Sequence, residues 1–111
     1  MNLIEEKKMV CEKLMNWKLE KGVSTKYWIL KDNKVKPIKM KNWNPQENRK
    51  CWDEIWDKLK DKKIINEYNK NIHMLIKKQK LNDMELFWFL HTLKPEICWE
   101  ILIKTLKGVF N

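Results

Sequence analysis

The residues best suited to chemistry are three cysteines and two histidines, and their spacing decides what they could do. Cys98 and His91 could act as nucleophile and general base, the pairing that activates a thiol. No local signature accompanies them, so a partly buried structural histidine is the favoured interpretation. A zinc site from Cys11, Cys51, Cys98 and either His73 or His91 lacks the ligand spacing of zinc motifs.

No other pattern in the chain indicates catalysis or a cofactor. Gly22 and Gly108 are the only glycines, so a glycine-rich phosphate loop is excluded. The carboxylates stand beside lysines on helix faces, which is typical of solvated ion pairs. The cysteines lie on or beside apolar stripes, as small buried residues do in a reducing compartment. We therefore expect no enzyme activity, and no catalytic, cofactor-binding or metal-binding residues.

A lysine-rich stretch with interleaved aromatic residues spans residues 21–50, within a chain of net charge +9. Lysines on an edge hairpin beside aromatic rings could hold single-stranded nucleic acid, with phosphates on lysines and bases stacked on rings. Alternatively, the lysines protect an exposed edge strand from aggregation and the aromatic residues belong to the core. The candidate partner or nucleic-acid surface comprises Lys26, Tyr27, Trp28, Lys31, Lys34, Lys36, Lys39, Lys41, Trp43, Arg49 and Lys50.

The type of the basic residues weakens the nucleic-acid interpretation. Arg49 is the only arginine among 24 basic residues, and arginine is preferred for bidentate contacts to phosphate and guanine. Lysine, asparagine and isoleucine are abundant, and their codons are rich in A and T. A low-GC genome would produce this composition without selection for charge, although lysine can still bind phosphate as a point charge.

Length and hydropathy bound the architecture. The 111 residues, of which 43% are hydrophobic, predict one domain over 1–111 with one real core. No apolar run approaches the 18 residues of a membrane span, so no membrane contact is expected. The acidic N-terminus lacks the apolar segment of a signal peptide. We expect a cytoplasmic protein.

The clearest element is a helix predicted over 44–60. Asn44 is a suitable N-cap, Pro45 fits the first turn, and Glu47 completes the spacing of a capping box. One apolar stripe then follows the helical period. Its members are Cys51, Trp52, Ile55, Trp56 and Leu59.

The N-terminal part predicts a helix, then a hairpin. Residues 3–19 form a helix whose apolar face includes Leu3, Val10, Leu14 and Trp17, with Gly22 closing it and Lys7 among the solvent-facing residues. Residues 26–31 predict a strand and 32–33 a turn. The alternation in 34–40 predicts a second strand, which Pro37 places at a sheet edge or a bulge.

The C-terminal part predicts a second hairpin and a final helix. Two apolar runs at 64–68 and 72–76 favour a hairpin, followed by a charged loop over 77–82. The continuous apolar run 84–91 carries no period, and its aromatic residues favour a strand over a helix. Pro95 opens a last helix that ends at Gly108. Trp17, Trp52, Trp56 and Trp88 are assigned to the core; an exposed Trp28, Trp43 or Trp99 would mark a partner surface.

The order of these signals resembles the phage ABA sandwich family of bacteriophages and prophages. The resemblance rests on an opening helix that ends in K-(V/L)-M-x-W, on a (W/F)-N-P-x-x-(N/D) motif, and on a closing helix that begins near P-x-x-I-C, which this chain carries one residue shorter as Pro-Glu-Ile-Cys at 95–98. The matching positions are Lys13, Leu14, Met15, Trp17, Trp43, Asn44, Pro45, Asn48, Trp52, Pro95, Ile97 and Cys98. It implies an α+β fold, with a small antiparallel sheet packed with helices in an α/β/α sandwich, and carries over no catalytic residue.

The functional expectation follows from this suspected origin. A small phage protein without catalytic groups acts most simply by occupying a surface, so we expect a non-enzymatic binding protein that occludes a host protein or ribonucleoprotein complex. Bacterial antiviral defence, including RNA-guided nucleases, is the target class, which makes the role anti-CRISPR-like. The alternative is a direct nucleic-acid-binding accessory protein that uses residues 26–50. The oligomeric state is left open.

Overall fold

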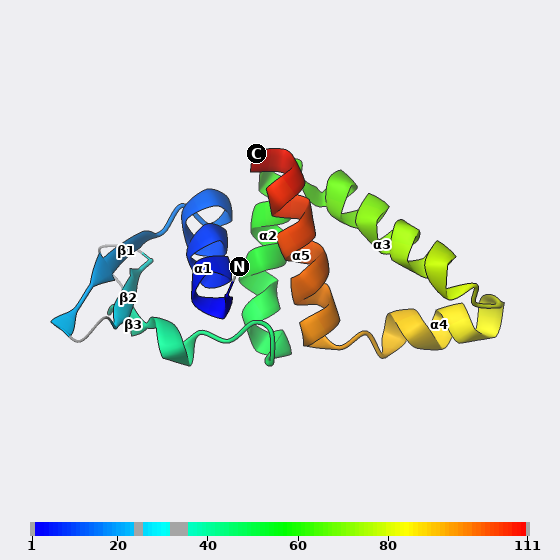
Figure 1. Ribbon diagram of the computed structural model, residues 1–111, viewed down its shortest axis with the longest axis horizontal. Coiled ribbons are helices and arrows are strands. Elements are labelled where there is room, and N and C mark those ends of the chain that lie inside the picture. Colours follow the sequence, from blue (N-terminus) through cyan, green and yellow to red (C-terminus); the bar gives the residue numbers. More distant parts are fainter. Residues whose placement is uncertain (1, 24–25, 32–35, 111) are drawn as a thin grey trace.

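The structure, a computed structural model, places helices and one small antiparallel sheet in the α+β class predicted from the sequence. It describes residues 2–23, 26–31 and 36–110. The molecule is elongated, with extents of 50 × 27 × 24 Å, and the sheet lies at one end beside α1 (Figure 1). The elements in chain order are α1 (Leu3–Met9), η1 (Val10–Leu14), β1 (Lys18–Lys21), β2 (Tyr27–Leu30), β3 (Ile38–Lys39), η3 (Met40–Asn42), η4 (Arg49–Cys51), α2 (Trp52–Asp61), α3 (Ile65–Gln79), α4 (Asp83–His91) and α5 (Pro95–Phe110).

The first helix is shorter than predicted, because the chain turns out of it before Trp17. Its last part, η1, is a π-helical turn, and Asn16 then adopts a left-handed conformation with φ of 55°. Asparagine tolerates this conformation, so it ends the helix in place of Gly22. The residues after Trp17 form strand β1 instead of the last helical turn.

The sheet has the strand order β1-β2-β3, with both pairs antiparallel. Strand β2 and the hairpin it forms with β3 confirm the predicted strands, and β3 lies at an edge, as Pro37 indicated. The predicted turn at 32–33 lies outside the described residues. Ile29 is fully buried on the inner face, whereas Trp28 and Lys39 are paired across the strands.

Helix α2 begins later than predicted, at Trp52 instead of Asn44. Asn44 does not cap the helix, because its Oδ1 accepts hydrogen bonds from the side chains of Lys7 and Gln46. Asn48 accepts from the Lys50 backbone N–H at 3.0 Å and so begins the short 3₁₀ turn η4 instead. The apolar stripe is confirmed, since its central side chains are buried in the core.

The predicted second hairpin is wrong, because residues 65–79 form the single helix α3. Ile65, Tyr68, Ile72 and Leu75 follow a helical period, and all four pack on the core. Between the two apolar runs, Asn69 and Lys70 are exposed on the outer face of the helix, and the Asn71 side chain donates a hydrogen bond to Thr105 Oγ1 of α5 at 2.9 Å. The helix ends in a left-handed Lys80, with φ of 49°.

The strand predicted over 84–91 is also wrong, because it forms helix α4. Asn82 caps this helix: its Oδ1 accepts from the Glu85 N–H at 2.8 Å, and its side-chain amide donates to the Glu85 carboxylate at 2.8 Å. This reciprocal cap stabilises a helix start. The final helix begins at Pro95 as predicted, but α5 continues past Gly108 to Phe110.

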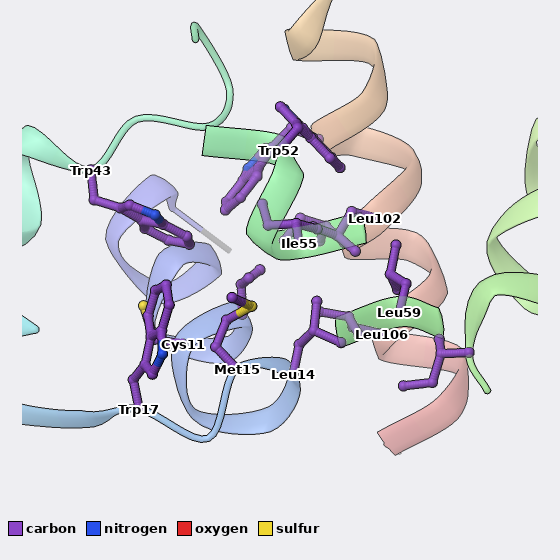
Figure 2. Close-up of a cluster of buried hydrophobic side chains, with 14 of the residues drawn as sticks. Cys11, Leu14, Met15, Trp17, Trp43, Trp52, Ile55, Leu59, Leu102 and Leu106 are labelled. Atoms are coloured by element: carbon purple, nitrogen blue, oxygen red, sulfur yellow. The ribbon is translucent and has the colours of Figure 1, made fainter. Parts of the chain in front are cut away.

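The core is built where η1, α2 and α5 meet (Figure 2). Trp43 lies between Trp17 and Trp99, with ring centroids at 5.6 Å and 6.1 Å and near-perpendicular planes. These three rings are buried, which assigns Trp43 and Trp99 to the core. Trp88, predicted in the core, is 59% exposed.

Candidate functional site

A cleft of about 340 Å³ opens between the first turns of α1, strand β2 and the junction of β3 with η3. Its size is that of a small binding site. The apolar side chains come mainly from α1 and η3, and lysines stand around them. The lining residues are Leu3, Ile4, Lys7, Lys26, Tyr27, Trp28, Lys39, Met40 and Lys41.

The α1 wall of the cleft is placed by a helix cap. Asn2 Oδ1 accepts a hydrogen bond from the Glu5 N–H at 2.9 Å, which begins the helix at Leu3. Leu3 and Ile4 therefore lie in the first turn, where they are 41% and 52% exposed. Exposed aliphatic side chains beside lysines form a surface that can bury an apolar group of a charged partner.

Trp28 and Lys39 border the cleft from the face of the sheet opposite Tyr27, where Trp28 also lines a second cleft with Glu20, Gly22 and Pro37. Trp28 is the cross-strand partner of Lys39, so their side chains share one face of the sheet. The Lys39 ammonium lies 5.5 Å from the centroid of the Trp28 ring, which is within the range of a cation–π interaction. This pair presents an aromatic face and a positive charge side by side.

Tyr27 lies on the opposite face of β2 and is engaged by α1. Its hydroxyl accepts a hydrogen bond from Lys8 Nζ at 2.6 Å, and the same ammonium lies 3.9 Å from the ring centroid. The hydrogen bond from Lys8 lowers the pKa of Tyr27. Tyr27 therefore joins α1 to the sheet and is held in place for any ligand of the cleft.

Lys7 is a buried lysine at the inner end of the cleft, which corrects its assignment to solvent. Its ammonium donates to the Met40 carbonyl at 3.2 Å and to Asn44 Oδ1 at 2.8 Å. Burial lowers the pKa of Lys7, and Glu47 opposes that shift. These two hydrogen bonds attach α1 to the segment that forms the far wall of the cleft.

Replacing Lys7 with methionine should make the protein more stable at neutral pH, because it removes the cost of burying an ammonium group. Folded Lys7 releases its proton at a lower pH than unfolded lysine does, so its unfavourable contribution disappears as pH rises toward 10.5. Urea unfolding at about pH 7 and about pH 10 should therefore show a shrinking advantage for Lys7→Met. The exposed Lys104→Met is the control; an advantage independent of pH would contradict this prediction.

The structure brings together only part of the candidate surface predicted from the sequence. Lys26, Tyr27, Trp28, Lys39 and Lys41 line the cleft. The sequence missed the other four lining residues, although position 7 falls on the apolar face shared by positions 3, 10 and 14. Only that spacing could have indicated a buried lysine.

The remaining candidates lie elsewhere. Trp43 is buried in the core, which corrects its assignment to a partner surface. Lys31 forms an ion pair with Glu54 at 2.9 Å and does not line the cleft. Arg49 donates to the Leu93 carbonyl at 2.7 Å, beside the start of α5. Lys50 adjoins Arg49 in η4, and neither lines the cleft. Lys36 is exposed ahead of β3 without lining the cleft, and Lys34 lies outside the described residues.

The thiols of Cys11 and Cys98 favour their neutral form. Burial raises the pKa of Cys11 to about 12, and burial also raises the pKa of Cys98. The Cys98–His91 pair lies outside the described side chains, because that of His91 is not among them, and His73 is exposed. Within residues 2–23, 26–31 and 36–110, no group of three His, Cys, Asp or Glu side chains could hold a metal ion.

Comparison of the chain with protein-family models, curated proteins and solved structures finds no match. Support for a function of the lysine-rimmed cleft therefore comes from its lining residues alone. Among the helices of the described part, none has both the length and the apolar character needed to cross a membrane.

Proposed function

We propose that this chain is a non-enzymatic binding protein of a phage or prophage that occludes a host macromolecule. The observation that carries the proposal is the cleft, in which Lys26, Lys39 and Lys41 surround apolar side chains. Lysines at a rim attract an acidic partner, and a partner side chain that enters an apolar centre loses its water. The target class is bacterial antiviral defence, an anti-CRISPR-like role, with an acidic protein or ribonucleoprotein surface as the group bound.

The arrangement of the rings favours a protein partner over a bare single strand. Single-strand platforms stack successive bases on several aromatic side chains. Trp43 is buried and Tyr27 is engaged by Lys8, so Trp28 is the one ring of the predicted surface left for stacking. Direct nucleic-acid binding is the second candidate, and the Trp28–Lys39 pair is the observation that favours it.

The test reverses the charge of the rim in the variant Lys26→Glu, Lys39→Glu, Lys41→Glu. Affinity for a partner captured by the tagged protein from nuclease-treated host lysate should fall on the order of 100-fold, because three attractive charges become repulsive. The matched control reverses Lys60, Lys70 and Lys107, which are exposed on α2, α3 and α5. Equal losses for both variants would reduce the effect to net charge and refute the role of the cleft.

Nuclease treatment separates the two candidates. A stoichiometric partner that survives nuclease, and whose affinity depends moderately on salt, supports occlusion of a host protein or ribonucleoprotein. Binding that disappears with nuclease, and that falls steeply with salt toward a single-stranded oligonucleotide, supports the second candidate. If an untreated lysate yields no protein partner and no bound nucleic acid, both candidate functions are contradicted.

A further inference from the structure

Helix α4 is apolar around most of its circumference and yet stays uncovered. Its sequence, DMELFWFLH, is mostly apolar, and a helix that is apolar all round is normally buried. None of its described side chains is buried. Met84, Phe87 and Trp88 are 73%, 54% and 59% exposed. The apolar side chains of α4 therefore remain exposed to solvent in a single copy of the chain.

The position of α4 explains why the chain does not cover it. In Figure 1, α4 lies at the end of the molecule opposite the sheet, where the chain turns back from the end of α3 toward the start of α5. It packs broadly against no other described element, while α3 packs on α5. The Phe87 and Trp88 rings lie edge to face with centroids 5.9 Å apart, so they form one firm aromatic surface. A groove beside them is lined by Leu81, Asn82, Met84, Glu85, Trp88 and Phe89.

We propose that the occupant of this surface is a second copy of the chain, with the two α4 helices packed antiparallel about a two-fold axis. A two-fold contact covers the same apolar helix in both copies at once. Side chains of this size each have about 200 Å² of surface, so the exposed parts of Met84, Phe87 and Trp88 supply roughly 400 Å² per copy. With the flanking residues of the groove, two copies bury about 1,000 Å², which is the lower limit for a specific interface.

Charge selects the antiparallel orientation of the two helices. Asp83 and Glu85 are exposed at the start of α4, and Lys94 is exposed just after its end. Antiparallel packing places the two acids of each copy near Lys94 of the other copy, where opposite charges attract.

Sedimentation velocity over about 1 to 200 μM protein, at about 0.15 M salt, tests the proposal. We expect a reversible dimer with a dissociation constant on the order of 10 μM, as befits a small interface. Trp88→Glu should weaken dimerisation at least about tenfold, because each two-fold contact would bury two unpaired carboxylates. The matched control is Val23→Glu, which places the same charge at a side chain that is 91% exposed near the sheet.

A charge exchange tests the orientation. Reversal of Asp83 and Glu85 to lysine should weaken the dimer, and addition of Lys94→Glu should restore part of the loss. A wild-type chain that stays monomeric at the highest concentration overturns the proposal, including the case in which it binds lipid vesicles instead. A dimer that Trp88→Glu leaves intact overturns it as well. Far-UV circular dichroism verifies that each variant is folded.

Discussion

Replacing Trp43 with alanine should lower the free energy of unfolding by about 3–5 kcal/mol, the range for loss of a large aromatic side chain from a core. Trp43 is only 4% exposed and lies edge to face with both Trp17 and Trp99. Its removal leaves a cavity between the rings of Trp17 and Trp99 that the surrounding chain cannot close completely. Urea unfolding followed by far-UV circular dichroism measures the loss.

The control for Trp43 is Trp88→Ala, studied at a concentration low enough for the chain to be monomeric. Trp88 is 59% exposed, so its removal should change the free energy of unfolding by about 0.5 kcal/mol or less. Similar effects of the two substitutions would contradict the placement of both rings. The comparison also decides between the surface role that the sequence allowed for Trp43 and the core role seen in the structure.

The second large effect is a loss of stability in alkali that depends on Cys11. Burial raises the pKa of this thiol from 9.0 to about 12, with Glu12 adding to the shift. Above pH 9 Cys11 is ionised in the unfolded chain but neutral in the folded chain. The free energy of the unfolded state therefore falls relative to that of the folded state. The stability contributed by Cys11 is complete below pH 9 and falls by about 1.4 kcal/mol per pH unit, to a total of about 4 kcal/mol near pH 12.

Comparison with Cys11→Ala isolates this contribution, because Tyr68 and Cys98 also have raised pKa values and act in the same direction. At about pH 8 the variant should be less stable by about 1 kcal/mol, the cost of a small cavity. By about pH 11 the order should reverse, since only the wild type loses the thiol contribution. Curves that stay parallel over this range would show that Cys11 is accessible to water in the folded chain.

The two surfaces proposed for binding lie at opposite ends of the long axis (Figure 1). A dimer formed through α4 would therefore leave the lysine-rimmed cleft of each copy open. Variants of the cleft should keep the dimer, and variants of α4 should keep the cleft. Partner binding at the cleft and dimerisation through α4 can therefore be tested, and refuted, independently.

Local sequence signals determined the elements whose pattern is strong over a short range. The stripe of α2, the start of α5 at Pro95 and strand β2 were all predicted, because spacing and turn residues act within a few positions. The α+β class, which the resemblance implied, is confirmed as well. The lysine-rich stretch was recognised as basic and aromatic, and five of its eleven candidates do line the cleft.

Tertiary contacts decided the rest. Asn44 has the spacing of a cap, but the ammonium of Lys7, 37 positions away, takes its side-chain oxygen, and the helix starts later. Lys18–Lys21 leaves the helix because β2 offers backbone partners for a strand. Trp43 is buried because Trp17 and Trp99 pack against it, and Lys31 forms an ion pair because Glu54 of α2 lies beside it. A sequence window contains side-chain types and their period, whereas burial depends on which neighbours arrive from elsewhere in the chain.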